Sequence, residues 1–280
     1  QNKTKEAIIY FEEGLNEIKE FFEKEHDKFI FPYIHFLFCL ANAYFLLNHI
    51  EKSMNLLYEA LNISKPYVYN YPEEFATPYV YLLCELGLCY NKLNRPEEAL
   101  DLYKEAFLLS DDQNLMFILQ GLGISYLRAG NFEEAIRLFK ELLGILKPLF
   151  DKEPIQWLTH YVNTLFFLGI CYHELENYEE AISFYNEALN MLKPYFEDNP
   201  DRWIENYASL LNNLGLVHDS LNDFQEAIRL YNEALNTLKP YFENNPDRWI
   251  INYVNLLSSL AFTYLQLNNF QLAKKYFIEA

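Results

Sequence analysis

The sequence has few of the residues that carry catalysis or bind metal ions. It contains four cysteines and six histidines in 280 residues, with no Cys-x-x-Cys pair and no His-Glu-x-x-His pattern. It also lacks a glycine-rich phosphate loop and a nucleophilic serine motif. We therefore expect a protein that is not an enzyme and that has no catalytic residues, no metal site and no cofactor.

Basic residues are also scarce. Lysine and arginine number 22 against 40 acidic residues, which gives a net charge of −18. This charge repels phosphate backbones and anionic lipids, so nucleic acid and membrane surfaces are not expected as partners. No run of 18 apolar residues occurs, so we expect no membrane span. The cysteines, at 39, 84, 89 and 171, are expected to be small buried hydrophobic residues in a reducing, cytoplasmic setting.

What the chain does contain is a repeating pattern. Leu-x-x-Leu-Gly/Ala-x-x-Tyr, followed about nine residues later by Ala-x-x-x-aromatic-x-x-Ala, recurs six times with few substitutions. The small residue after the second leucine marks each copy, and the steps between markers are 46, 36, 46, 46 and 46 residues. The markers are Ala41, Gly87, Gly123, Gly169, Gly215 and Ala261. The leucine spacing places both side chains on one helical face, so each copy predicts a pair of packed helices.

Residues at fixed places in each copy predict how the two helices meet. The marker is small because a neighbouring helix must pass close to it, next to large residues. Asn, Asp, Gly or Pro between the helices predicts a short turn. Asp223 and Glu226 have the spacing of a helix-capping box. The prolines at 148, 194 and 240 are expected to kink or end their helices.

The pattern resembles the tetratricopeptide repeat (TPR) family over essentially the whole chain. The resemblance implies an all-α fold, an α-solenoid in which antiparallel helix pairs stack as a right-handed superhelix. We expect a single solenoid over 1–280, with 1–22 as the second helix of a truncated copy. The six pairs are expected at 29–66, 75–110, 114–148, 157–194, 200–240 and 246–280. Because Ala7, Phe11 and Ala280 match positions inside the pattern, we expect a fragment of a longer chain.

The copies depart from the family in length. A standard repeat has about 34 residues, so a step of 46 adds about 12 residues, or roughly 18 Å of helix. The extension contains a Lys-Pro-x-Phe element and then Trp157, Trp203 or Trp249, and Asn-Pro pairs are expected to start the long helices. Long repeats of this kind resemble those of bacterial signalling and defence proteins and of kinesin light chains. In the one short copy, residues 110–113 replace the extension, and we expect a step in the rim near residues 107–117.

In the TPR family a concave groove, lined by first-helix positions, binds partners. Of the 24 positions that correspond in this chain, only Asp219 is charged. The groove therefore lacks the Lys and Arg that grip the acidic tails of chaperones, and the resemblance argues against that class of partner. The predicted groove residues are His35, Phe38, Asn42, Tyr81, Asn91, Phe117, Gln120, Asn163, Phe166, His173, Ser209, Asn212, Asn213, Asn255 and Ser258.

Two functions fit the resemblance. The first is a protein-interaction scaffold that holds a peptide or a partner protein in the groove. The second is the sensor or regulatory arm of a larger enzyme, such as a protease or an NTPase, whose own missing flanking domains occupy the groove. A scaffold predicts capture of a foreign protein, whereas an arm predicts binding of its own flanking segments.

Overall fold

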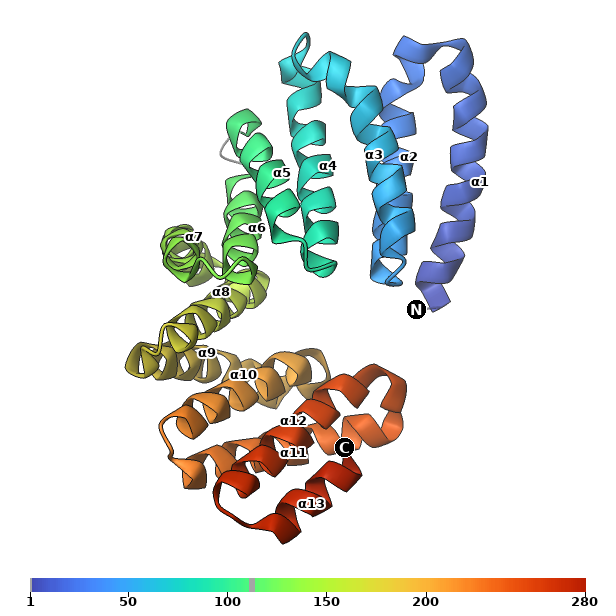
Figure 1. The fold of residues 1–280 in the computed structure, drawn as a ribbon. Coiled ribbons are helices and arrows are strands. Elements are labelled where there is room, and N and C mark those ends of the chain that lie inside the picture. Colours follow the sequence, from blue (N-terminus) through green and yellow to red (C-terminus); the bar gives the residue numbers. More distant parts are fainter. Residues whose placement is uncertain (1, 111–113) are drawn as a thin grey trace. The chain divides into compact units, whose positions relative to one another are not determined.

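The computed structural model describes residues 2–110 and 114–280, and every regular element in these ranges is an α-helix (Figure 1). The helices are α1 (Asn2–Lys24), α2 (His26–Leu46), α3 (Ile50–Val68), α4 (Pro72–Lys92), α5 (Pro96–Leu109), α6 (Leu115–Arg128), α7 (Phe132–Lys152), α8 (Pro154–Glu174), α9 (Tyr178–Asp198), α10 (Pro200–Ser220), α11 (Phe224–Asn244), α12 (Pro246–Gln266) and α13 (Phe270–Glu279). The predicted all-α fold is confirmed. The chain forms two compact units, residues 1–138 and 139–280.

Within each unit the helices pack as successive antiparallel pairs (Figure 1). In the first unit α2 packs on α3 and α4 packs on α5, while α4 also contacts both α2 and α6. In the second unit α8, α10 and α12 pack on α9, α11 and α13, and α10 contacts both α8 and α12. The first helices of successive copies therefore form one layer in each unit, and the second helices cover it.

The turn inside each pair has the same backbone geometry in every copy. Seven residues after each marker the backbone is left-handed, with φ between 56° and 76°. The next amide donates to the carbonyl five residues back, as from His49 to Tyr44 at 2.9 Å, and this bond closes the helix end. The left-handed residue is asparagine in four copies and Gly130 in a fifth, and both tolerate this region. Glu176 is the exception, at φ 57°.

Small markers are explained by rings that lie against them. A Cβ added to Gly215 would lie 2.5 Å from the Tyr231 ring, and one on Gly169 would lie 2.5 Å from the Tyr185 ring. Both tyrosine side chains are completely buried. Gly87 and Gly121 approach the ring of Tyr103 in the same way. The predicted close contact is confirmed, and it joins the marker to the tyrosine of the second helix.

In the second unit the extension is helical except at one residue between successive helices, Glu153, Asn199 or Asn245. Pro148, Pro194 and Pro240 were expected to kink or end their helices. Helices α7, α9 and α11 run four residues past them, so these prolines do not end the helices, and a kink stays a prediction. A proline in the last turn and a half costs one hydrogen bond, which the rest of the helix tolerates. Helices α10 and α12 begin at the expected Asn-Pro pairs, but neither asparagine side chain forms a capping hydrogen bond.

Capping by Asp223 is confirmed, because its carboxylate accepts a hydrogen bond from the Glu226 amide.

A repeated contact, which we call the tyrosine clamp, fastens the extension. Tyr207 of α10 stacks on Phe196 of the preceding helix, with ring centroids 4.3 Å apart, and its hydroxyl donates to Glu233 of α11 at 3.1 Å. The clamp thus joins a helix of one copy to both helices of the next. The stacked pairs Phe22–Tyr33 and Phe242–Tyr253 recur at the same spacing, and Phe150–Tyr161 recurs there as a tilted pair. The hydroxyl bonds recur as Tyr33–Glu59, Tyr79–Glu105 and Tyr253–Glu279.

The short copy has no tyrosine at the clamp position, where Leu115 begins α6. Helix α5 ends at Leu109, and residues 111–113 lie outside the described part of the chain. The expected step in the rim near residues 107–117 depends on them and stays a prediction.

Helix α2 is long and apolar enough to cross a membrane, which the absence of an unbroken apolar run had not indicated. Its most apolar window has a mean hydropathy of 1.6, and 44% of that window is buried inside the fold. No other described helix has these properties. Because the core helix of a folded protein has the same length and hydropathy, this feature is weak evidence for a membrane span.

Candidate functional site

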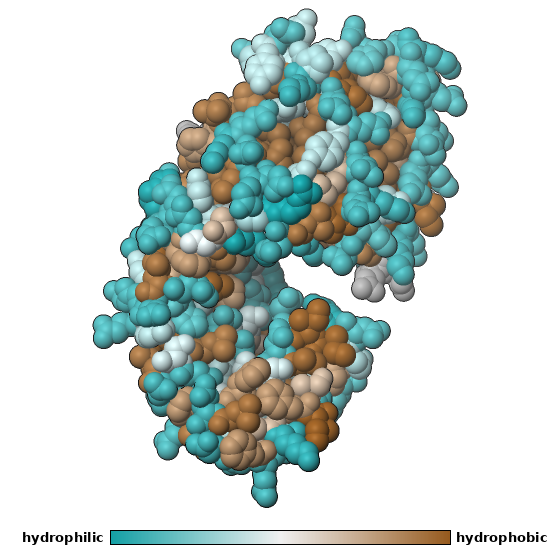
Figure 2. Space-filling view, viewed as in Figure 1, coloured by the Kyte–Doolittle hydropathy of each residue, from teal (hydrophilic) through white to brown (hydrophobic). Residues whose placement is uncertain are grey.

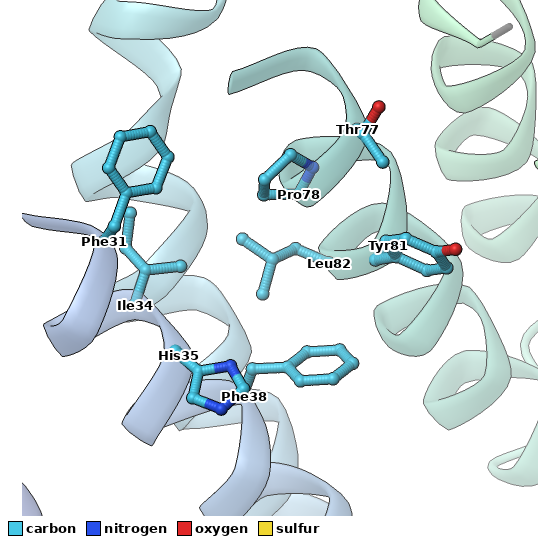
Figure 3. Close-up of a pocket in the computed structure, with 8 residues that line it drawn as sticks. All are labelled: Phe31, Ile34, His35, Phe38, Thr77, Pro78, Tyr81 and Leu82. Carbon is cyan, nitrogen blue, oxygen red and sulfur yellow. The ribbon is translucent and has the colours of Figure 1, made fainter. Parts of the chain in front are cut away.

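Side chains from α2 and α4 line an apolar pocket of about 430 Å³ in the first unit. Three predicted groove residues, His35, Phe38 and Tyr81, lie at this pocket. Figure 3 shows the residues of the two helices facing one another, with Leu82 between them. Among the described residues, no Asp, Glu, Lys or Arg side chain lines it, so it can hold an aliphatic or aromatic side chain. We call it the apolar pocket; its other residues are Phe31, Ile34, Thr77 and Pro78.

A second pocket, in the second unit, is lined mainly by amides. It has a volume of about 140 Å³ and lies where α8, α10 and α12 adjoin. Five predicted groove residues line it: Phe166, Ser209, Asn212, Asn213 and Asn255. Ala208, Asn252 and Leu256 complete what we call the amide pocket. A carboxamide donates and accepts hydrogen bonds, so this cluster can bind the peptide groups of an extended chain.

The amide pocket is connected to hydrogen bonds that fix its side chains. The Ser259 hydroxyl donates to the Asn212 carbonyl oxygen at 3.3 Å, which links α12 to α10. The Asn213 amide donates to the backbone oxygen of Ser209 at 2.9 Å. These bonds hold two of the four asparagines in set orientations, which lowers the entropy cost of binding a ligand.

The other predicted groove residues lie on first helices but at neither pocket. Phe117 is exposed on α6, and Asn42, Gln120 and Ser258 are half-buried. Asn163 of α8 accepts a hydrogen bond from Asn206 of α10 at 3.0 Å. The structure therefore gathers eight of the fifteen predicted residues at two pockets and spreads the rest over the same layer.

Two predicted groove residues are engaged within the fold. Asn91 is 4% exposed and donates to Ser125 at 2.9 Å, so its amide joins α4 to α6 and offers a ligand no accessible surface. His173 of α8 hydrogen-bonds to Ser220 of α10 at 3.0 Å, and burial lowers the pKa of its imidazole. Asn91 was predicted from its register alone, which does not reveal how closely the next helix packs.

Asp219, the one charged groove position, is held inside the layer. Its Oδ2 accepts hydrogen bonds from Thr263 at 2.7 Å and from Tyr231 at 2.8 Å. Its other oxygen is buried and has no partner among the described residues. Burial raises the pKa of this carboxyl group, although the two hydrogen bonds oppose the shift. Asp219 therefore connects two helices and does not present a charge to a ligand.

Sequence reasoning missed the pocket residues that precede the family's groove positions. Phe31 and Thr77 lie ten residues before their markers, and Asn252 lies nine before its own. These positions exist because the extension lengthens each first helix, and they continue the groove by about one turn. The 46-residue step was the available signal.

The described residues contain no group of three or more His, Cys, Asp or Glu side chains placed to hold a metal ion.

Family models for the tetratricopeptide repeat match residues 79–147, 162–193, 208–238 and 254–280 of this chain. Together these ranges cover more than half of its length. No curated protein matches the sequence.

Among solved structures, 252 chains match. BtubC (BKLC) from P. vanneervenii is 21% identical with a TM-score of 0.62, and the match covers 81% of this chain and 87% of that one. The apo form of RapI is 20% identical with a TM-score of 0.63, covering 87% and 80%. A signal transduction ATPase with numerous domains from Pyrococcus horikoshii, which carries a tetratricopeptide repeat sensor, is 18% identical with a TM-score of 0.65. That match covers 99% of this chain and 40% of the ATPase. At these identities the likeness establishes the fold.

Proposed function

Because this chain belongs to the tetratricopeptide repeat family, we propose that it is a protein-interaction scaffold that binds a peptide segment on its layer of first helices. One observation supports the proposal most directly: each unit has a pocket of its own that is lined by side chains from successive first helices. A fold of this kind is generally an interaction scaffold without catalysis, and no enzymatic step is proposed.

Each pocket supplies its own kind of contact for a peptide that binds within its unit. The apolar pocket fits a bulky side chain, whose burial contributes about 1.5–3 kcal/mol. The amide pocket fits the polar backbone of an extended segment, since each asparagine can pair with a peptide N–H and C=O. Nucleic acid and membranes are not proposed as partners because the net charge is −18. The four free cysteines accord with a cytoplasmic setting, which is part of the proposal.

The test is selection of displayed random dodecapeptides on the purified chain. Wild type is compared with the double variant Phe166→Ala/Asn212→Ala, which removes an apolar and an amide contact from the amide pocket. The matched control is Phe224→Ala/Asn236→Ala on α11, where neither residue lines that pocket. Equal helicity by circular dichroism is checked first. We expect peptides selected on wild type to bind the control equally and the double variant at least about tenfold more weakly, a loss of about 1.4 kcal/mol. Peptides that bind all three proteins alike would refute binding at this pocket.

A second candidate function, the sensor or regulatory arm of a larger protein, is favoured by one observation. The Pyrococcus horikoshii ATPase carries its repeats as a sensor, and the match spans nearly all of this chain but 40% of the ATPase. In addition, α13 exposes Phe270, Phe277 and Ile278, and Figure 2 shows apolar surface over the last helices. Apolar faces of this kind are often covered by a neighbouring domain.

This candidate is tested with any segment that the gene encodes on either side of the chain. Supplied as separate polypeptides, such segments should bind wild type and lose affinity for the double variant. Failure of every flanking segment to bind would exclude the regulatory-arm function, while leaving the scaffold function in place.

A further inference from the structure

A second hollow in the first unit lies beside the apolar pocket and has a different chemistry. Its volume is about 310 Å³, and it is formed by the start of α2, the end of α3, the turn after it and the start of α4. Its lining comprises four aromatic rings, two carboxylates and one isoleucine. We call it the rim pocket; its residues are Asp27, Ile30, Phe31, Tyr67, Tyr71, Glu74 and Phe75.

The rings of the rim pocket form a continuous wall. Phe31 and Phe75 stack with centroids 4.4 Å apart, and Phe75 stacks on Tyr67 at 5.0 Å. Tyr67 in turn lies 6.4 Å from Tyr71. These contacts join α2, α3 and α4, so the wall is held by packing before any ligand arrives.

The carboxylates remain largely in solvent. The side chain of Asp27 is 96% exposed; its carboxylate lies 3.9 Å from the imidazole of His26 and accepts a hydrogen bond from the Tyr67 hydroxyl at 3.5 Å. Lys28, next in sequence, is engaged with Glu25 at 3.1 Å. Glu74 is also exposed. No lysine or arginine lines the rim pocket, so its negative charge is available to a ligand.

Aromatic faces and carboxylates together select for a cation. Ring faces carry partial negative charge and attract guanidinium or ammonium groups, by about 0.5–2 kcal/mol. A guanidinium group is planar, stacks on rings and pairs with carboxylates through two parallel hydrogen bonds. The rim pocket therefore fits an arginine side chain and repels an acidic one.

Phe31 lies at both pockets, which fixes their separation. Helix α2 carries a residue of each pocket on either side of Phe31, namely Asp27 and His35, four residues away in each direction. Four residues of an α-helix advance about 6 Å along its axis. The two pockets thus lie about 6–12 Å apart along the helix. An extended peptide advances about 3.3 Å per residue, so two to four residues span this distance.

Two of the four rings of the rim pocket belong to the repeat itself, because Tyr67 and Phe75 occupy places where other copies also have a ring pair, as in Phe21–Phe29 and Tyr241–Trp249. The other two rings, Phe31 and Tyr71, do not follow from the repeat. The positions of Phe31 and Tyr71 are occupied in other copies by threonine, glutamate, isoleucine or asparagine, and those copies form the same helix pairs. Packing of the repeat therefore does not require aromatic side chains at these places. Their presence together where two successive copies meet points to binding.

We propose that the rim pocket and the apolar pocket together bind a partner segment with an arginine two to four residues from a bulky apolar residue. The inference deepens the proposed function, on which it rests, by naming the chemistry of the bound segment. The arginine lies between the ring wall and the two carboxylates, and the apolar residue enters the pocket beside Phe38 and Tyr81.

The probe is the same library of displayed random dodecapeptides, applied to wild type and to the variant Asp27→Asn/Glu74→Gln. The matched control is Asp101→Asn/Glu51→Gln, which changes the net charge equally at exposed sites on α5 and α3 that line neither pocket. A selected peptide is then synthesised with citrulline in place of arginine, which keeps the shape and removes the charge. Its affinity is measured for all three proteins.

We expect the selected peptides to share the arginine and apolar pair. Citrulline should weaken binding about tenfold on wild type and on the control, and clearly less on Asp27→Asn/Glu74→Gln, where only the ring faces still attract the charge. Peptides that bind through the groove but lack a basic residue, or that lose equal affinity to citrulline on all three proteins, would overturn the inference and leave the scaffold function standing. No selected peptide at all would overturn both.

Discussion

Replacing Gly215 by alanine tests whether the marker residue is small because of the tyrosine ring beside it. The added Cβ would lie 2.5 Å from the Tyr231 ring, below any normal contact distance. The ring cannot easily give way, because it is completely buried and its hydroxyl is bonded to Asp219 at 2.8 Å.

The expected change in the free energy of unfolding is the difference between two opposing contributions. Alanine gains about 1 kcal/mol over glycine from helix propensity, whereas overpacking a rigid core costs about 1–3 kcal/mol. With an immobile ring the cost lies at the upper end, so Gly215→Ala should lower the free energy of unfolding by about 2 kcal/mol. Gly144 of α7 is exposed, and its added Cβ would meet nothing within 4 Å. The same substitution there should raise the free energy of unfolding by about 1 kcal/mol.

Urea unfolding followed by tryptophan fluorescence measures both variants. All three tryptophans, at 157, 203 and 249, belong to the second unit, as do Gly144 and Gly215. The signal therefore reports the unit that carries the substitutions, and the shift in midpoint gives the change in free energy. If Gly215→Ala stabilised the unit as Gly144→Ala does, the packing argument would be refuted.

A double variant separates the clash from other effects. Gly215→Ala/Tyr231→Leu reproduces the pair Ala41 and Leu57 of the first copy, both completely buried. The leucine is smaller than the ring, so the two changes together should destabilise less than the sum of their separate effects, by about 1 kcal/mol. Simple additivity would show that the ring and the added methyl group do not meet.

Four further results are expected. Tyr207→Phe removes a clamp hydrogen bond and should lower the free energy of unfolding by about 1 kcal/mol. Burial raises the pKa of Tyr207 from 10.0 to about 12, so the wild type should lose stability as the pH rises above 10. Urea midpoints measured across that pH range should fall less in the variant. Burial raises the pKa of Asp219 above 3.8, so wild-type stability should fall relative to Asp219→Asn as the pH rises through that value, and the opposite slope would contradict the burial argument. A thiol reagent followed by mass spectrometry should modify half-buried Cys39 before the three buried cysteines, and equal rates would contradict their burial. Glu176→Gly should raise the melting temperature, since it removes a left-handed strain of about 1 kcal/mol; an unchanged or lower value would argue against strain.

Much of the fold could be predicted because its determinants are local and periodic. The leucine spacing, the small markers and the turn residues each act within one helix pair, so copies at fixed steps encode them directly. The capping bond of Asp223 also lies within three residues, and it was predicted correctly. The Asn-Pro helix starts were predicted for the same reason, although neither asparagine side chain caps its helix with a hydrogen bond.

The site was less predictable because it depends on contacts between copies. Asn91 was predicted to line the groove from its position in the repeat, four residues after the marker. The packing of α6 on α4 instead buries it against Ser125. Phe31 was overlooked because it precedes the family's groove positions, although it lies at two pockets. The tyrosine clamp was also missed. The sequence does contain a signal for it: a tyrosine and a glutamate 26 residues apart, such as Tyr207 and Glu233, recur in other copies. This spacing can be interpreted only when each copy is assumed to be an extended helix pair.

The tyrosine clamp has a consequence for how such a chain can lengthen or shorten over time. Each complete clamp, at Tyr33, Tyr207 and Tyr253, takes its phenylalanine from one copy and its tyrosine and glutamate from the next, at constant spacing. Duplication of a gene segment that encodes 46 residues therefore supplies all three clamp residues at the right spacing. A small insertion in the extension changes the spacing between them and breaks the clamp. Residues 193–203 and 239–249 differ only at Asp198 and Asn244, which fits a recent exchange between copies. Whole copies can thus be gained or lost while the tyrosine clamps between neighbouring copies stay the same, and the exposed residues of each copy are free to diverge.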